Sequence, residues 1–270
     1  MRLDQEDKEG GKEMSFLEHL EELRIRLIRS FIAVAVFTIV AFVYMDVLFE
    51  SVILAPSRTD FWTYKMLCKI SENTCVENID IRFQNRVLTG QFMMHIVSSL
   101  VLGLIVAFPY VFMQLWKFVK PALSRKERRS VRGTVFFVAL LFFLGVLFGY
   151  YVLSPLSINF LANYSIHKDI PNIIDITNYV TTVAMMVLAC GIVFQLPIVI
   201  LLLTKVGILS SSIMKRYRRH AVVILLIFAA ILTPSPDLFS QLIVAMPMYL
   251  LFELSILLAV RTERKEQQRN

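Results

Sequence analysis

Long apolar runs alternate with short charged segments along the chain. The runs are roughly 14 to 25 residues long, and most can cross the hydrocarbon core of a bilayer as a helix. A helix is the expected form because lipid cannot pair with backbone amides, so each backbone group must be bonded inside its own segment. The pattern predicts six membrane-spanning helices, at about residues 27–49, 92–113, 133–154, 180–204, 220–233 and 238–260.

The fifth run is shorter than the others. From His220 to Thr233 it has 14 residues, or about 21 Å of helix at 1.5 Å per residue. A span of that length thins the bilayer or is shielded by partners. The alternative is that the snorkelling side chains of Arg218 and Arg219 lengthen it. We expect a locally thinned membrane around this helix.

The polar ends of the chain lie outside these spans. Residues 1–14 are rich in acids and glycine and are predicted to be disordered. Ser15 to Glu18 has the pattern of a capping box, which opens a helix. The apolar residues of that helix share one face: Phe16, Leu20, Leu23 and Leu27. The sequence therefore predicts one six-helix domain over residues 15–260, followed by a tail at 261–270.

Composition agrees with a membrane protein. The chain has 270 residues, of which 57% are hydrophobic and 18% charged, and its mean hydropathy is +0.65. A soluble domain is nearer half apolar and a quarter charged. A soluble enzyme, a disordered chain and a coiled coil are excluded, and the predicted fold class is an all-α polytopic membrane protein.

The distribution of the net charge of +7 predicts the orientation. In a soluble protein such an excess could indicate nucleic acid, but here the basic residues lie beside apolar spans. The loop 117–132 has seven basic residues and one acid, and the loop 205–219 has five basic residues and no acid. Because basic loops stay in the cytoplasm, both termini are expected there. The loops 50–91, 155–179 and 234–237 are expected outside, and nucleic acid is not an expected partner.

Few polar residues lie inside the predicted spans, and these are candidates for function. An ionisable group in a membrane is a functional hypothesis because burying its charge costs about 3 kcal/mol or more. The alternative is an interhelical hydrogen bond, worth about 0.6 kcal/mol on average. Both interpretations stay open for Gln195 and Gln241. Glu253 lies near the cytoplasmic end of its span, where solvation at the interface is an equal alternative, and His95 is a further polar residue of the second span.

Two acids near the cytoplasmic interface, Glu22 and Glu127, are more unusual. By spacing alone, local ion pairs explain them, because Glu22 has Arg26 four residues on and Glu127 stands among arginines. Exposed pairs of this kind contribute about 0.3–0.5 kcal/mol and seldom indicate function. The sequence contains no Ser/His/Asp or Cys/His set and no metal-ligand spacing. Neither an enzyme nor a metal or cofactor site is expected.

Four groups of motifs follow one another along the chain. The first, MSFLEHLEELRIRL, covers residues 14–27. The second joins Pro109 to QLWKFVKPAL at 114–123 and ERR at 127–129. The third group consists of Pro155-Leu156, Phe160-Leu161 and Asp175 to Tyr179. The fourth consists of LTPSPDLFSQ at 232–241 and AMPMY at 245–249. From about residue 14 to residue 260 these motifs resemble the TatC family, the membrane receptor of the twin-arginine protein translocase.

The resemblance implies a function in protein export. TatC-like proteins bind the twin-arginine signal peptides of folded cargo at their cytoplasmic face. They form an oligomeric complex with small single-span partners of the TatA/TatB type in the bacterial inner membrane, and this complex exports the cargo with the proton-motive force. The family is not catalytic and has no cofactor.

The resemblance also implies roles for individual residues. In the family, the acid of the first motif and the acid of the first cytoplasmic loop receive the arginines of the signal. These positions are Glu22 and Glu127, with Leu23, Arg24 and Phe118 beside them. Outer-face and partner-contact positions of the family correspond to four further residues: Pro56, Asp237, Gln241 and Glu253.

The sequence departs from the family in two places. Many relatives have Glu before the proline of the fourth span, where this chain has Gln195, so a polar bonding role is expected there rather than a proton-carrying one. The outer loop from Ser57 to Gln91 matches poorly. We predict that Cys68 and Cys75 of this loop form a disulfide, because they share the oxidising side of the membrane and are seven residues apart. Two unrelated thiols are the alternative that spacing leaves open.

Two other classes of protein compete with the export receptor. An ion-coupled secondary transporter usually has an internal repeat and charged sites at the membrane midplane, and the sequence has neither. A purely structural membrane scaffold is the other alternative, and it requires that signal peptides fail to bind.

Overall fold

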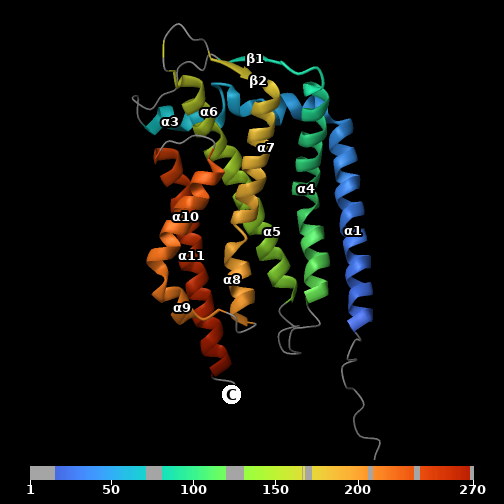
Figure 1. The fold of residues 1–270 in the computed structure, drawn as a ribbon, viewed down its shortest axis with the longest axis vertical. Coiled ribbons are helices and arrows are strands. Elements are labelled where there is room, and N and C mark those ends of the chain that lie inside the picture. The colour runs from blue at the N-terminus through green and yellow to red at the C-terminus, as the bar shows by residue number, and fades with distance from the viewer. Residues whose placement is uncertain are drawn as a thin grey trace, which may run out of the picture.

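The structure, a computed structural model, describes residues 16–70, 81–119, 131–165, 167, 172–205, 209–233 and 238–267. Long helices run side by side along the longest axis of the molecule (Figure 1). The first residues of α1 (Phe16–Val43) and the last of α11 (Leu238–Gln267) lie at one end, here called the terminal end. The opposite end, called the sheet end, carries α3 (Trp62–Ile70), β1 (Arg82–Gln84) and β2 (Ile173–Asp175).

Five helical stretches of the described residues are long and apolar enough to cross a membrane: Leu20–Val43, Gly90–Phe118, Val135–Asn163, Ile176–Thr204 and Ser240–Arg261. They confirm five of the six predicted spans as helices of sufficient length. The remaining one, α10 (Arg218–Leu232), is a helix of 15 residues, about 22 Å long. The expected short helix is therefore present, and it is shorter than a normal bilayer core.

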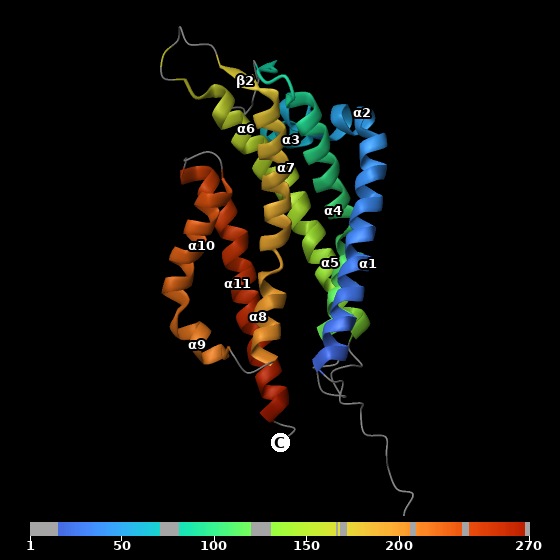
Figure 2. The ribbon, with the colours of Figure 1, turned by 45° about the vertical axis from the view of Figure 1, so that its right-hand side comes forward.

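α1 packs mainly against α4 (Gly90–Val119), and the two run antiparallel at one edge of the molecule (Figures 1 and 2). Gly103 of α4 allows the close approach. A Cβ there would lie 2.4 Å from Thr38 Oγ1 and 2.6 Å from the Thr38 backbone nitrogen. Much of the remaining α1 surface is apolar and exposed, with Phe31 75% and Val43 69% exposed, as expected for a helix that faces lipid. Exposed charges lie nearer its start, at Glu21, Arg24 and Arg29.

The chain leaves α1 through short irregular helices at the sheet end: α2 (Met45–Leu48), the π-helix η1 (Phe49–Ile53) and the 3₁₀ helix η2 (Ala55–Ser57). Pro56 is buried here. The helix α3 follows, so the long outer loop predicted from the sequence is partly helical.

The all-α prediction missed a small sheet. β1 pairs in parallel with β2, with Phe83 opposite Ile174. Strands of three residues are too short to show an alternating pattern in the sequence. The pair joins the two loops 50–91 and 155–179, which the sequence analysis treated as separate.

Asp175 ends β2 and caps α7 (Ile176–Val193). Its Oδ1 accepts from the backbone N–H of Thr177 at 2.9 Å and of Asn178 at 3.2 Å. The pKa of Asp175 is lowered, first by the N–H of Asn178 and then by those of Arg86 and Thr177, which bond the charged form. An Asp at this position fixes where the fourth span begins.

The third and fourth spans are each built from several helical pieces. α5 (Val131–Phe148) continues through a π turn, η6 (Gly149–Leu153), into α6 (Ser154–Asn163). The third span is thus longer than predicted, because Pro155 lies in the first turn of α6, where its missing N–H breaks no helical bond. α7 and α8 (Leu196–Lys205) are separated by a turn at Phe194 and Gln195, just before Pro197.

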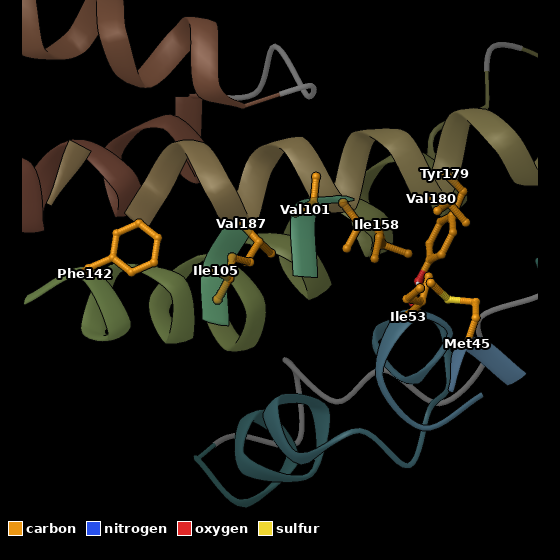
Figure 3. Packing of buried hydrophobic residues seen from close by; sticks show 10 residues of the cluster. Met45, Ile53, Val101, Ile105, Phe142, Ile158, Tyr179, Val180 and Val187 are labelled. Atoms are coloured by element: carbon orange, nitrogen blue, oxygen red, sulfur yellow. The ribbon is translucent and has the colours of Figure 1, made fainter. Parts of the chain in front are cut away.

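The largest core lies between α4, α5 and α7 (Figure 3). It brings together buried side chains of distant segments: Met45, Ile53, Val101, Ile105, Phe142, Ile158, Tyr179, Val180, Val183 and Val187. Phe108 stacks on Phe142 with the ring centroids 3.6 Å apart. A second core joins α7 to α10 and α11 on the other side of the molecule (Figure 2).

We predict that Gly103→Ala loosens α1. The added methyl group meets the Thr38 backbone, which cannot turn aside as a flexible side chain can, so the variant should lose about 1–3 kcal/mol of stability. Thermal unfolding in detergent measures the loss. Val106→Ile, which adds a methylene to a 52%-exposed position of the same helix, is the control and should unfold like the parent. An unchanged unfolding temperature for Gly103→Ala would contradict the close approach.

Candidate functional site

Glu22 lies on the second turn of α1, at the terminal end. Arg26, one turn further on, donates from Nε to Glu22 Oε1 over 3.1 Å, and its Nη2 donates to the same oxygen. Both side chains are largely covered, Glu22 being 24% and Arg26 18% exposed. The local ion pair that spacing suggested is therefore formed.

The pair leaves Glu22 half satisfied. Its second carboxylate oxygen, Oε2, is buried and has no hydrogen-bond partner among the described residues. A buried acceptor without a partner costs about 1–3 kcal/mol, and more when it is charged. A carboxylate oxygen has lone pairs for more than one hydrogen bond, so the capacity of Oε2 is unused among the described residues.

The end of α4 lies level with Glu22. Thr38 lies against Gly103, and Glu22 precedes Thr38 by about 16 residues of helix. In an antiparallel pair, the residues of α4 at the level of Glu22 are therefore those near Phe118. Phe118 is half-buried, so α1 and α4 bring Glu22 and Phe118 to the same region of the terminal end.

The two residues after Glu22 face different surroundings. Leu23 is half-buried and Arg24 is exposed. Glu127, the second predicted acid, lies outside the described residues, and so do Asp237 and Cys75.

Sequence reasoning gave no role to two buried polar side chains near the end of α4. Gln114 is 3% and Trp116 8% exposed. Within the described part of the chain, Gln114 Oε1 and Trp116 Nε1 have no hydrogen-bond partner. Together with Glu22 Oε2, the α1–α4 pair thus carries unpaired donors and acceptors toward its terminal end. The sequence did contain a signal for these two residues. Both side chains can form hydrogen bonds, and both lie in a mostly apolar run, at QLW, residues 114–116.

The two intramembrane amides form bonds between helices. Gln195 Nε2 donates to the carbonyl of Val138 at 3.2 Å, while its Oε1 is buried and unpaired among the described residues. Gln241 Nε2 donates to the carbonyl of Leu226 at 2.9 Å, which ties α11 to α10. These bonds agree with the structural interpretation of both residues.

Both carboxylate oxygens of Glu253 accept a hydrogen bond. Arg218 Nη2 donates to its Oε2 at 2.8 Å, and the Tyr249 hydroxyl donates to its Oε1 at 3.0 Å. The Glu253 side chain is 25% exposed. The ion pair joins the first residue of α10 to the middle of α11.

The sequence analysis treated residues 261–270 as a tail and therefore gave no role to Glu263, a further carboxylate on α11. α11 continues to Gln267, and Glu263 accepts the backbone N–H of Ser211 on Oε1 at 2.6 Å and the Ser211 hydroxyl on Oε2. Ser211 opens α9 (Ser211–Arg216). The end of α11 therefore holds the first turn of α9.

Other predicted residues lie at the sheet end. The carbonyl of Pro56 accepts from the hydroxyl of Tyr64 at 3.1 Å. His95 Nε2 is 3.0 Å from the carbonyl of Phe42, and its ring stacks on that of Phe42. Both residues therefore have structural partners between helices.

The cysteines divide into two kinds. Cys68 on α3 is disulfide-bonded, whereas Cys190 on α7 is a buried free thiol. The pairing of Cys68 with Cys75 remains a prediction. Among the residues that the structure describes, no three His, Cys, Asp or Glu side chains gather as metal ligands would.

Long apolar helices, polar side chains paired across them and a half-satisfied carboxylate at one end are the features of a polytopic helical membrane protein. The model of the family described as Sec-independent protein translocase protein (TatC) matches residues 18–247. The chain belongs to the TatC family. It is accordingly a multi-pass inner-membrane subunit of the Sec-independent protein translocase, a non-enzymatic transport system in which TatC works with other Tat subunits.

Individual relatives agree along almost the whole chain. The Sec-independent protein translocase protein TatC of Blattabacterium sp. subsp. Periplaneta americana is 38% identical over 96% of this chain and 100% of its own length. The TatC protein of Koribacter versatilis is 34% identical over 99% of this chain and 92% of its own. A crystal structure of the twin-arginine translocase receptor TatC in DDM matches with a TM-score of 0.69 at 31% identity, over 90% of this chain and 99% of that one.

We predict that the partner of Cys68 is Cys75. Trypsin separates MLCK, residues 66–69, from ISENTCVENIDIR, residues 70–82, so a disulfide is the only bond that would keep the two peptides together. Mass spectrometry of an unreduced, alkylated digest should show the two peptides linked, and adding reductant should separate them. The peptide that contains Cys190 should be alkylated and serves as the control. Two separately alkylated loop peptides would show that the pairing is wrong.

Proposed function

We propose that this chain is the signal-peptide receptor and core subunit of the twin-arginine translocase. It binds the twin-arginine signal peptides of folded proteins and, with TatA/TatB-type partners, exports them with the proton-motive force. The half-satisfied carboxylate of Glu22 carries the proposal, since it offers an acceptor to an incoming donor.

The topology that goes with this function has six spans and both termini in the cytoplasm. Two features support it. The start of α1 and the end of α11 lie at the same end of the molecule (Figure 1), and the strongly basic loops 117–132 and 205–219 belong on the cytoplasmic side. The terminal end is then cytoplasmic, and the sheet end faces outside.

Recognition of arginine by Glu22 and Glu127 has a clear physical basis. The cytoplasmic face is basic, so its long-range field repels a peptide with two arginines. Binding therefore needs short-range acceptors. A guanidinium fork forms two charge-assisted hydrogen bonds with a carboxylate, a geometry that lysine cannot copy. Leu23 and Phe118 would contact the apolar part of the signal, and Arg24 would lie beside its polar part.

The remaining predicted residues are proposed to serve the partners. Gln241 and Glu253 belong to the α10–α11 pair, where the short α10 would thin the membrane and admit a single-span partner helix. Pro56 and Asp237 would act at the outer face. Gln195, an amide in the turn between α7 and α8 that bonds to α5, would hold this turn to α5 and would not carry protons.

We predict that Glu22→Ala and Glu127→Ala each weaken binding of a twin-arginine signal peptide. Losing a hydrogen bond to a charged group costs about 1.5–3 kcal/mol, so each affinity should fall roughly ten- to a hundredfold. Titration of the detergent-solubilised protein at fixed ionic strength gives the affinity, with a twin-lysine peptide as the ligand control. Glu21→Ala is the matched protein control. Parental affinity in the double mutant, with the protein still folded, would exclude this role.

We predict the opposite sign for Arg26→Gln. Arg26 occupies Glu22 Oε1, so an arriving arginine meets one free oxygen and a like charge. Removing the guanidinium frees both oxygens for a fork and should tighten binding roughly fivefold, about 1 kcal/mol. Arg29→Gln, which removes a neighbouring exposed charge, controls for the change in net charge. Weaker binding in Arg26→Gln would mean that Arg26 positions the carboxylate instead of competing for it.

A further inference from the structure

The helix α3 has an exposed face that the export function does not use. Its members recur at helical spacing: Trp62, Lys65, Met66 and Lys69. Trp62 is 57% and Met66 39% exposed. Both lysines are exposed, and neither forms an ion pair within the described part of the chain. Two large apolar groups and two free cations thus share one surface.

The opposite face of α3 is fixed to the protein. Tyr64 is 1% exposed, and its hydroxyl donates to the carbonyls of Pro56 at 3.1 Å and Pro155 at 2.8 Å. Burial raises the pKa of Tyr64, so it stays a donor. Thr63 donates to the carbonyl of Tyr151, and Cys68 is disulfide-bonded. The helix therefore cannot turn its apolar side chains inward.

α3 also packs against one of the apolar stretches that can cross a membrane. Tyr151 belongs to the apolar stretch Val135–Asn163, and the Trp62 ring meets the Tyr151 ring edge to face, with centroids 5.9 Å apart. Figure 1 shows α3 beside the ends of the long helices at the sheet end. Tryptophan and tyrosine concentrate at the boundary between hydrocarbon and headgroups.

We propose that the exposed face of α3 is a binding site for anionic phospholipid in the leaflet at the sheet end. Trp62 and Met66 enter the upper hydrocarbon region, and Lys65 and Lys69 reach the headgroup phosphates on their flexible stems. A zwitterionic headgroup carries its own cation and leaves the two lysines less well matched, so the site prefers a lipid with net negative charge.

The chemistry of the face favours lipid over a protein partner. An interface core between proteins is depleted in lysine, and here two lysines alternate with the apolar groups. Because α3 is held by hydrogen bonds and a disulfide, binding lipid does not have to order it first. The proposal is independent of signal-peptide recognition, which belongs to the terminal end.

The test uses the single tryptophan that remains in a Trp116→Phe background, namely Trp62. The protein is reconstituted in phosphatidylcholine, and its emission is titrated with phosphatidylglycerol or phosphatidylcholine brominated near the headgroup end of the acyl chains. The brominated phosphatidylglycerol should quench at a lower mole fraction. Lys65→Gln and Lys69→Gln should each reduce the preference roughly fivefold, whereas the control Lys215→Gln, on a lysine of α9 at the terminal end, should leave it unchanged.

Two outcomes would overturn the proposal. Equal quenching by both lipids would mean that α3 contacts the membrane without selecting a headgroup, and absence of quenching would mean that another molecule or solvent covers this face. If Trp116→Phe does not fold, native mass spectrometry of the chain with both tryptophans replaces the fluorescence test. It compares the phosphatidylglycerol retained by the parent with that retained by the double lysine variant. Equal retention would also overturn it.

Discussion

The need to pair every backbone amide within lipid governs the architecture. Inside the bilayer the chain is helical, and the two strands occur at one end, beyond the ends of the spans. Where the backbone leaves the α-helical pattern, side chains supply the missing bonds. In and beside η1 and η2, the carbonyls of Val52, Ile53 and Pro56 accept from the hydroxyls of Tyr150, Tyr179 and Tyr64. The irregular turn at the sheet end is therefore a bonded structure.

The same constraint applies to the polar groups at the two ends of the molecule. At the sheet end, tyrosines, the β1–β2 pair and the Asp175 cap pair backbone polar groups, although Ser157 Oγ and Thr177 Oγ1 are buried there without partners among the described residues. Toward the terminal end, Glu22 and Gln114 keep buried oxygens without partners among the described residues. Unpaired buried groups are costly, so each of them calls for an explanation. Unpaired buried polar atoms thus occur at both ends of the molecule, and the carboxylate among them lies at the terminal end.

Packing decides how the terminal end is presented. α1 leans mainly on α4 through the close contact at Gly103, and most of its remaining surface faces outward. Glu22 therefore sits on a helix with one firm neighbour, level with Phe118. On the other side of the molecule, the Arg218–Glu253 and Ser211–Glu263 contacts hold the short helices α9 and α10 to α11. These polar contacts add to the apolar packing of α9 and α10 on α11.

The sequence by itself determined the membrane class, five long spans and the short fifth helix, because runs of apolar residues are properties of neighbouring positions. Ion-pair spacing alone favoured a local pair for Glu22, and only the resemblance of its motif made this acid a candidate site. The motifs also identified the family. The tertiary structure alone decided the pairing of β1 with β2, the free oxygen of Glu22 and the capping of α9 by Glu263. Each of these joins segments far apart in the chain, or depends on which atoms a neighbouring helix covers, and a linear pattern carries no information on either.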